Sequence, residues 1–187
     1  MVNIFKEGKV DLRKRVKLSI PKLIKEILDK DIEYFNIKLE KLCNIIVQEM
    51  GYEPVLRIQD KLKNERKIPI TFNLNERNTK FLQDMIKCSP EKLETEFFRS
   101  LFSTYCNLHP SLREKVVKKN LYLEIEISIK EKLPIKVSYN NKVIDILPIT
   151  FLRDILTDYN SLECTNEESK ETMVLQLKNI EILNTNL

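Results

Sequence analysis

Two short stretches of sequence with the same alternating pattern decide the fold of the first half of the chain. The first is Arg13-Lys14-Arg15-Val16-Lys17-Leu18-Ser19-Ile20-Pro21, and the second, about fifty residues later, is Lys67-Ile68-Pro69-Ile70-Thr71-Phe72-Asn73-Leu74-Asn75. In both, nearly every second residue is apolar. Because successive side chains of a β-strand point to opposite faces, each stretch predicts a strand with one buried face. The other face carries basic and small polar residues.

Helical spacing of apolar residues follows each predicted strand. Pro21 suits the first turn of a helix, and Gly51 suits the end of a second one. After the second strand, Asn75 is predicted to cap a helix, and Ser89-Pro90 is predicted to cap and start another. The apolar residues of these four helices are Leu23, Ile24, Ile27 and Leu28; Leu39, Leu42, Ile45, Ile46 and Met50; Phe81, Leu82, Met85 and Ile86; and Leu93, Phe97, Leu101, Phe102 and Tyr105. The order strand, helix, helix therefore occurs twice.

The pattern changes to strands after Asn120. Residues 121–129 alternate strictly between apolar and polar side chains, which predicts a strand with one buried face. Residues 135–139 and 142–147 flank Asn140-Asn141, which predicts a hairpin because Asn tolerates positive φ, and Pro148 is expected to end the second of these strands. Further strands are predicted at 159–164 and at 173–183, the last bent near Asn179. Several short antiparallel strands within about sixty-five residues predict a small β-barrel. Together with the helices of the first half, this predicts an α+β fold.

These patterns divide the chain into four parts. They are a first strand-helix-helix copy at 1–51, a connector at 52–66, a second copy at 67–119 and a barrel at 120–187.

Composition excludes several classes of protein. The chain has 187 residues, of which 42% are hydrophobic and 32% charged, as in a globular protein. Two glycines argue against a glycine-rich phosphate loop. Cys43, Cys88, Cys106 and Cys164 are widely spaced and, with the single His109, predict neither a zinc site nor any other metal or cofactor. No signal peptide or membrane span is evident, so we expect a cytoplasmic protein that does not contact a membrane.

Charge is distributed unevenly along the chain. The net charge is +4, but residues 9–25 carry seven basic side chains against Asp11 alone, whereas acidic residues predominate after residue 120. A basic front end combined with a core-facing alternation indicates a surface for a polyanion. No arrangement of nucleophile, base or paired carboxylates predicts an enzyme, and His109, beside Pro110 at a helix break, is interpreted as structural.

The first half resembles the ribbon-helix-helix family of DNA-binding repressors, here as a tandem copy. In that family two strands form an antiparallel ribbon that enters the major groove, and the N-terminus of the second helix binds a phosphate. The resemblance implies that Arg15, Lys17 and Ser19 of one copy, and Thr71 and Asn73 of the other, face the groove. It implies phosphate contacts for Lys14, Lys22 and the helix starts near Lys38 and Ser89, with Arg13 in the same basic run. Whether the copies pair within one chain or between two chains of a homodimer stays open.

The last third resembles the WYL domain, a small Sm- or SH3-like barrel of prokaryotic regulators and CRISPR-associated proteins. The matching segments are Leu-Pro-Ile-Lys-Val-Ser-Tyr139, Val-Ile-Asp-Ile-Leu-Pro148, Asp158-Tyr159-Asn160 and Val-Leu-Gln-Leu-Lys-Asn-Ile180. The family's name tripeptide is reduced here to its Tyr. By resemblance, the ligand-binding residues are Tyr139, Arg153, Asp158, Tyr159 and Lys178.

Together these resemblances imply a DNA-binding transcriptional regulator whose WYL domain senses a ligand or a partner. An alternative is a CRISPR-associated accessory protein that binds single-stranded RNA and modulates a large RNA-guided nuclease. A third interpretation is a protein-interaction module whose basic face is incidental.

Overall fold

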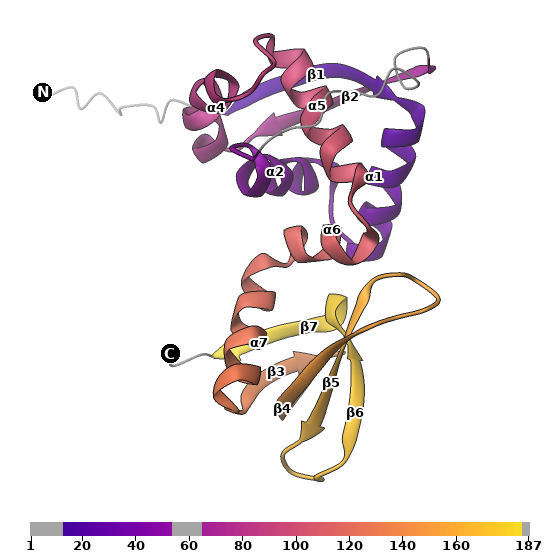
Figure 1. Cartoon of the computed structure of the whole chain (residues 1–187), viewed down its shortest axis with the longest axis vertical. Helices are drawn as coiled ribbons and strands as arrows, with labels where there is room; N and C mark the ends of the chain where they lie inside the picture. The colour runs from indigo at the N-terminus through magenta and orange to yellow at the C-terminus, as the bar shows by residue number, and fades with distance from the viewer. Residues whose placement is uncertain (1–12, 54–64, 185–187) are drawn as a thin grey trace, which may run out of the picture. The chain divides into compact units, whose positions relative to one another are not determined.

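The computed structural model of the chain describes residues 13–53 and 65–184, and it divides between Tyr105 and Cys106 into two units (Figure 1). Most of the expected connector, 54–64, lies outside the described residues. The division falls earlier than the predicted start of the barrel at residue 120, because two further helices belong to the second unit.

The first unit contains the predicted two-stranded ribbon. Strands β1 (Lys14–Pro21) and β2 (Lys67–Leu74) pair antiparallel, with Lys17 opposite Thr71. The two copies therefore pair within one chain. Alternate residues of both strands are buried, as the pattern predicted: Val16, Leu18, Ile20, Ile70, Phe72 and Leu74.

Two helices follow each strand in the first unit (Figure 1). They are α1 (Lys22–Phe35), α2 (Leu39–Met50), α4 (Glu76–Cys88) and α5 (Glu94–Asn107). Asn75 caps α4 as predicted, since its side-chain oxygen accepts a hydrogen bond of 2.8 Å from the backbone N–H of Asn78. Gly51 follows α2 in a right-handed conformation, and a Cβ there would lie 2.6 Å from the sulfur of Met85, so close packing explains the glycine.

The predicted helix start at Ser89-Pro90 is wrong. Ser89 instead ends α4, where its backbone N–H donates to the carbonyl of Met85, and α5 begins only at Glu94. The Oγ of Ser89 accepts a hydrogen bond from the N–H of Glu91, so this hydroxyl stabilises the turn between two helices. A Ser-Pro pair is compatible with a helix start and equally with such a turn. The local sequence therefore did not distinguish between the two.

Aromatic residues of α5 form the core beneath the ribbon. The ring of Phe72 on β2 lies 5.8 Å from the rings of both Phe98 and Phe102, in edge-to-face contacts. The predicted core residues Phe97 and Tyr105 are also fully buried. This packing covers the apolar face of the ribbon and leaves its polar face outward.

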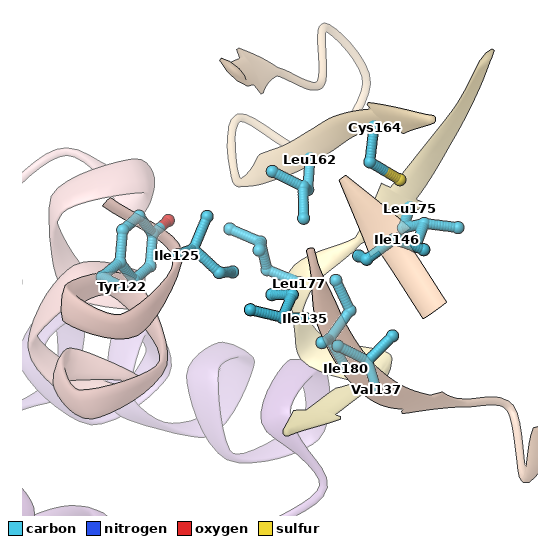
Figure 2. Packing of buried hydrophobic residues seen from close by; sticks show 10 residues of the cluster. All are labelled: Tyr122, Ile125, Ile135, Val137, Ile146, Leu162, Cys164, Leu175, Leu177 and Ile180. Atoms are coloured by element: carbon cyan, nitrogen blue, oxygen red, sulfur yellow. The ribbon is translucent and has the colours of Figure 1, made fainter. Parts of the chain in front are cut away.

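Residues 121–129, predicted as a strand, form a helix instead. The second unit begins with α6 (Pro110–Val117) and α7 (Lys119–Glu131). The alternating pattern places Leu121, Ile125 and Ile129 four residues apart, which is also one face of a helix. Tyr122 and Ile125 of α7 point into the core of the sheet, whereas Leu123 and Ile127 stay exposed (Figure 2).

The remaining elements form an open five-stranded sheet. In chain order they are β3 (Ile135–Tyr139), β4 (Lys142–Arg153), β5 (Asn160–Asn166), β6 (Thr172–Gln176), the 3₁₀ turn η1 (Leu177–Asn179) and β7 (Ile180–Asn184). The strands are ordered β6-β5-β4-β3-β7. The predicted hairpin is confirmed, since Asn140 and Asn141 have φ of 49° and 65°. The predicted bend near Asn179 is η1.

Two expectations for this sheet need correction. Pro148 does not end its strand: β4 continues to Arg153, and its register against β5 shifts between Pro148 and Thr150. A bulge of this kind accommodates a proline within a sheet. The predicted closed barrel is also wrong for the described residues, because β6 and β7 are the two edges of the sheet and do not pair with each other.

Among the residues that the structure describes, no helix combines the length and the apolar character needed to cross a bilayer.

Candidate nucleic-acid interface

The outward face of the β1–β2 ribbon brings together the residues that the sequence predicted for it. The antiparallel register places Arg15 opposite Asn73, Lys17 opposite Thr71, and Ser19 opposite Pro69. Residues two apart on one strand are separated by about 6.8 Å, close to two base-pair steps of B-form DNA. Side chains from both strands therefore form one short, regularly spaced array.

The charge of this array is uniform in sign. Positions 15, 17 and 19 of β1 and 67, 69, 71 and 73 of β2 hold three basic residues and no carboxylate. Arg15, Lys17, Lys67 and Thr71 are exposed, while Ser19 and Asn73 are half-buried. Such a surface offers guanidinium, ammonium, hydroxyl and amide groups, which are the groups that contact phosphates and base edges.

Side chains of α2 contact β2 near its C-terminal end. The carboxylate of Glu40 accepts hydrogen bonds from the backbone N–H and the side-chain amide of Asn73, at 3.2 and 3.0 Å. The amide of Asn44 donates to the carbonyl of Asn73, and its oxygen accepts from the N–H of Asn75, both at 2.8 Å. Asn73 is therefore held in place by α2, and its side chain already has one partner.

The edge of β1 is covered in a similar way by α4 and α5. Nε of Arg99 donates to the carbonyl of Ser19 at 2.8 Å, and the backbone N–H of Lys14 donates to Oγ1 of Thr79 at 3.3 Å. Helices therefore contact both edges of the ribbon at these positions, while the outward face carries the exposed basic side chains.

The lysines predicted to bind phosphates have acidic neighbours. The ammonium of Lys14 is paired with Glu94, and that of Lys22 lies 3.3 Å from Glu26. The Lys22 pair is exposed on both sides, so a phosphate can replace Glu26 at little cost. Lys14 is more enclosed than Lys22, with 37% of its side chain exposed. Its partner Glu94 therefore competes with a phosphate more strongly than Glu26 does. Arg13, in the same basic run, directly precedes β1 and is exposed.

The two predicted helix-start sites differ in geometry. Lys38 is the extended residue before α2, and no side chain caps that helix; a hollow of about 500 Å³ lies there, lined by Lys38, Glu40, Lys41, Asn44, Ile45, Gln48 and Asn75. This end of α2 neighbours the ribbon face through the contact of Glu40 with Asn73. Ser89 is buried at the end of α4, so it offers no helix N-terminus to a phosphate.

The five predicted ligand-binding residues of the second unit do not gather at one place. Arg153, Asp158 and Tyr159 lie together at the turn between β4 and β5, where the N–H of Asp158 donates to the carbonyl of Asp154 at 2.8 Å. Tyr139 lies at the other end of β4, beside the hairpin, and Lys178 is in η1. Tyr159 is buried, and Asp158 adopts a positive φ of 61°.

Sequence reasoning missed a buried carboxylate next to this turn. Glu114 of α6 is fully buried and accepts hydrogen bonds from the backbone N–H of Asn160 at 2.7 Å and from the hydroxyl of Tyr122 at 3.3 Å. Desolvation by burial raises the pKa of Glu114 to about 7, against the lowering effect of these hydrogen bonds and of Lys118. Its second oxygen, Oε1, is buried and has no hydrogen-bond partner among the described residues. Glu114 joins α6, α7 and β5; no sequence motif marks it.

The side chain of His109, interpreted from the sequence as structural, caps helix α6. It precedes α6, and its Nδ1 accepts a hydrogen bond from the N–H of Ser111 at 3.4 Å. The four cysteines are free, and three of them, Cys43, Cys106 and Cys164, are buried.

Comparison with known proteins gives a likeness in fold. No protein-family model matches the chain, and no curated protein matches its sequence. A solved structure titled "Crystal structure of a CRISPR Cas-related protein" is similar in fold, with a TM-score of 0.67 over 90% of this chain at 13% sequence identity. This chain spans 62% of that protein's length. The likeness shows that the two proteins share a fold.

Proposed function

We propose that this protein binds nucleic acid through the outward face of the β1–β2 ribbon. In this proposal the ligand is duplex DNA, and the protein is a transcriptional regulator that recognises its sequence. The observation that carries the proposal is the register of the ribbon, which aligns Arg15 with Asn73 and Lys17 with Thr71 on one face whose strand positions hold no carboxylate.

The dimensions of a ribbon support duplex DNA. A two-stranded ribbon fits the major groove, where Arg contacts guanine and Asn contacts adenine through paired hydrogen bonds. Here the ribbon is complete in one chain, so groove binding needs no second copy, unlike in the ribbon-helix-helix repressors that the chain resembles. A homodimer, predicted from that family, would place two ribbons on one site.

The test is a titration of the purified full chain against duplex DNA from the region upstream of its own gene. We expect Arg15→Ala/Lys17→Ala to weaken binding at least tenfold, because it removes two groove or phosphate contacts. The matched control is Lys30→Ala/Lys87→Ala, which removes the same charge from exposed positions of α1 and α4 outside the ribbon. Equal losses in the two double variants would overturn the ribbon as the interface.

Salt dependence separates base reading from charge attraction. Purely electrostatic binding falls steeply with salt, so sequence-dependent affinity at higher salt supports a regulator that reads an operator. Binding that disappears at moderate salt, or that prefers single strands, argues against the regulator.

A second candidate function is that of a CRISPR-associated accessory protein. It is favoured by the shared fold with a protein whose title reads "CRISPR Cas-related protein". In this function the basic face binds single-stranded RNA and another surface binds a large nuclease. A gene for such a nuclease next to this one, together with co-purification of the two proteins, would support it.

The second unit is proposed to sense a small ligand or a protein partner in the manner of the WYL domains it resembles. The turn that carries Arg153, Asp158 and Tyr159 is the proposed contact region. Cytoplasmic location and the absence of catalysis belong to the same proposal.

A further inference from the structure

Strand β6 is an open edge of the sheet in the second unit. Among the described residues, its backbone pairs with β5 and with no other strand. A strand at the edge of a sheet directs the N–H and C=O groups of every second residue away from the sheet. In the described part of the chain, no further backbone hydrogen bond joins residues 172–176 to a neighbouring element. This edge therefore keeps backbone donors and acceptors that can pair with another strand.

The sequence of β6 does not protect this edge. Proteins usually protect edge strands with charged side chains, prolines, bulges or a covering helix. The sequence of β6, Thr-Met-Val-Leu-Gln, contains no charged residue and no proline, and its register against β5 is regular. In the first unit, by contrast, the edges of the ribbon receive hydrogen bonds from helix side chains, such as that from Arg99 to the carbonyl of Ser19. The edge of β6 is therefore suited to strand pairing.

The side chains of β6 leave apolar surface on both faces of the sheet. Leu175 is buried in the core (Figure 2), and Met173 packs against the same core while it stays partly exposed. Val174 lies on the opposite face, where 57% of the residue is exposed. A strand added beside β6 would cover Met173 at the margin of the core and Val174 on the outer face.

The sequence of β6 is complementary to itself in an antiparallel arrangement. A twofold axis at Val174 places this residue opposite its counterpart in a second copy. In the same register, Met173 lies opposite Leu175 on the core face. Thr172 lies opposite Gln176 on the outer face. Apolar side chains therefore meet apolar ones and polar side chains meet polar ones, which is favourable for cross-strand pairs.

The charges that flank β6 favour the same arrangement. Glu171 directly precedes the strand, and Lys178 follows its end by two residues. Because antiparallel strands run in opposite directions, Glu171 of one copy lies at the end of the pair where Lys178 of the other copy is found. The remaining glutamates of the β5–β6 turn, Glu167 and Glu168, are likewise placed at opposite ends in the two copies. Like charges stay apart and opposite charges come together.

We propose that β6 is the interface through which two copies of this chain form a dimer, with the two β6 strands paired antiparallel about Val174 in one continuous sheet. A pair of five-residue strands is small for a dimer interface, so the dimer dissociates on dilution. The interface itself is independent of what the ribbon binds. That the dimer presents two ribbons to one DNA site rests on the proposed function.

The experiment is sedimentation velocity of the purified full chain, without nucleic acid, over about a hundredfold range of concentration. We expect a reversible equilibrium between monomer and dimer. Val174→Lys places two like charges opposite each other at the twofold axis and should raise the dissociation constant about tenfold or more, and Val174→Glu should do the same. Val143→Lys is the matched control, since Val143 is 60% exposed on β4 inside the sheet, and it should leave the dimer unchanged.

A mixture of the two charged variants tests the register. Equal amounts of Val174→Lys and Val174→Glu place opposite charges across the twofold axis, so a heterodimer should form at concentrations where each variant alone is monomeric. A fluorescent label on one variant identifies the mixed species in the sedimentation profile. Because only folded chains can associate in this way, the recovery also shows that the single variants did not lose the dimer by misfolding.

The other outcomes would overturn the inference. These are a wild-type protein that stays monomeric throughout, and a dimer that Val174→Lys and Val143→Lys weaken equally. Species larger than a dimer would indicate head-to-tail pairing of β6 with β7, and a mixture without recovery would indicate another register or another strand as the partner. Arg15→Ala/Lys17→Ala should lose DNA binding and remain dimeric, so failure of the ribbon and failure of the β6 interface can be told apart.

Discussion

The two units use acidic side chains in opposite ways. In the first unit, Glu40, Glu94 and Glu96 lie at the margins of the ribbon, where they pair with Asn73, Lys14 and Arg99 while staying partly exposed. In the second unit, Glu114 is fully buried and holds two helices and a strand together. A carboxylate at the surface adjusts the local charge, whereas a buried one couples folding to protonation.

The partly exposed carboxylates lie beside a surface suited to binding, whereas Glu114 lies where it can stabilise the packing of helices and a strand. Around the ribbon, the described carboxylates lie near the edges, and none of them forms an ion pair with Arg15, Lys17 or Lys67. At Glu114, the hydrogen bonds only partly offset the cost of desolvation, and Oε1 has no hydrogen-bond partner within the described part of the chain. Substitutions at the two places should therefore differ in both size and kind of effect.

The largest effect is expected from Glu114→Ala. It leaves the N–H and amide of Asn160 and the hydroxyl of Tyr122 without their acceptor, which should cost about 3 kcal/mol of unfolding free energy. Urea unfolding followed by circular dichroism measures it. Glu126→Ala, on the exposed face of α7, is the control and should change stability by no more than about 0.5 kcal/mol. Similar losses in both variants would mean that Glu114 has no special role.

The next effect concerns pH. The pKa of Glu114 is raised from 4.5 to about 7 in the folded state, so the folded protein holds this proton more tightly than the unfolded chain. Its contribution to stability is complete below the unfolded pKa and is lost as pH rises through the folded pKa, a change of about 3 kcal/mol. We expect Glu114→Gln to lose less stability than the wild type between pH 5 and pH 8, in parallel urea titrations. Parallel pH profiles for the two proteins would contradict the prediction.

A smaller loss is expected from Asn44→Ala in the first unit. Asn44 contacts the carbonyl of Asn73, the N–H of Asn75 and the side chain of Asn78, so its removal should cost about 1–2 kcal/mol. Gln48→Ala, one turn later on α2 and exposed, is the matched amide control. If duplex DNA binding also weakens, Asn44 positions Asn73 for contact; unchanged binding would limit Asn44 to a structural role.

The smallest effect on stability is expected from Glu94→Gln, below about 1 kcal/mol, because its ion pair with Lys14 is partly exposed. The same change frees Lys14 and should raise affinity for duplex DNA severalfold, with a steeper salt dependence. Asp84→Asn, which removes a carboxylate paired with Lys87 on α4, is the control. Equal gains from both variants would show that net charge alone is responsible.

Similar alternation in the sequence has two structural outcomes in this chain. Residues 14–21 and 67–74 form strands, whereas 121–129 form a helix. A period of two contains a period of four, so Leu121, Ile125 and Ile129 also lie along one helical face. The β-branched residues of the ribbon favour a strand and its prolines disfavour a helix, while Leu, Glu and Lys in 121–131 favour a helix. Weighing propensity together with periodicity would have separated the two cases.

The candidate interface was more predictable than the rest of the molecule. Which of Arg15, Lys17, Ser19, Thr71 and Asn73 share a face follows from strand alternation alone. That they belong to one ribbon depends on pairing across about fifty residues of chain, which local sequence does not encode. The acidic partners of Lys14 and Lys22 illustrate one local and one long-range contact. Glu26 is a helical neighbour of Lys22, whereas Glu94 is eighty residues from Lys14.

By itself the sequence determined the two ribbon strands, the helices of the first unit apart from the start of α5, the Asn140-Asn141 hairpin and the basic character of the outward face. Each of these follows from interactions between residues close in the chain, such as alternation, helical spacing, capping and positive φ. Only the tertiary structure decided that the ribbon closes within one chain, that the second sheet stays open, that Glu114 is buried and that Phe81 is exposed. These features depend on which surfaces pack together in the folded protein. Burial and desolvation follow from that tertiary packing and not from a local sequence pattern.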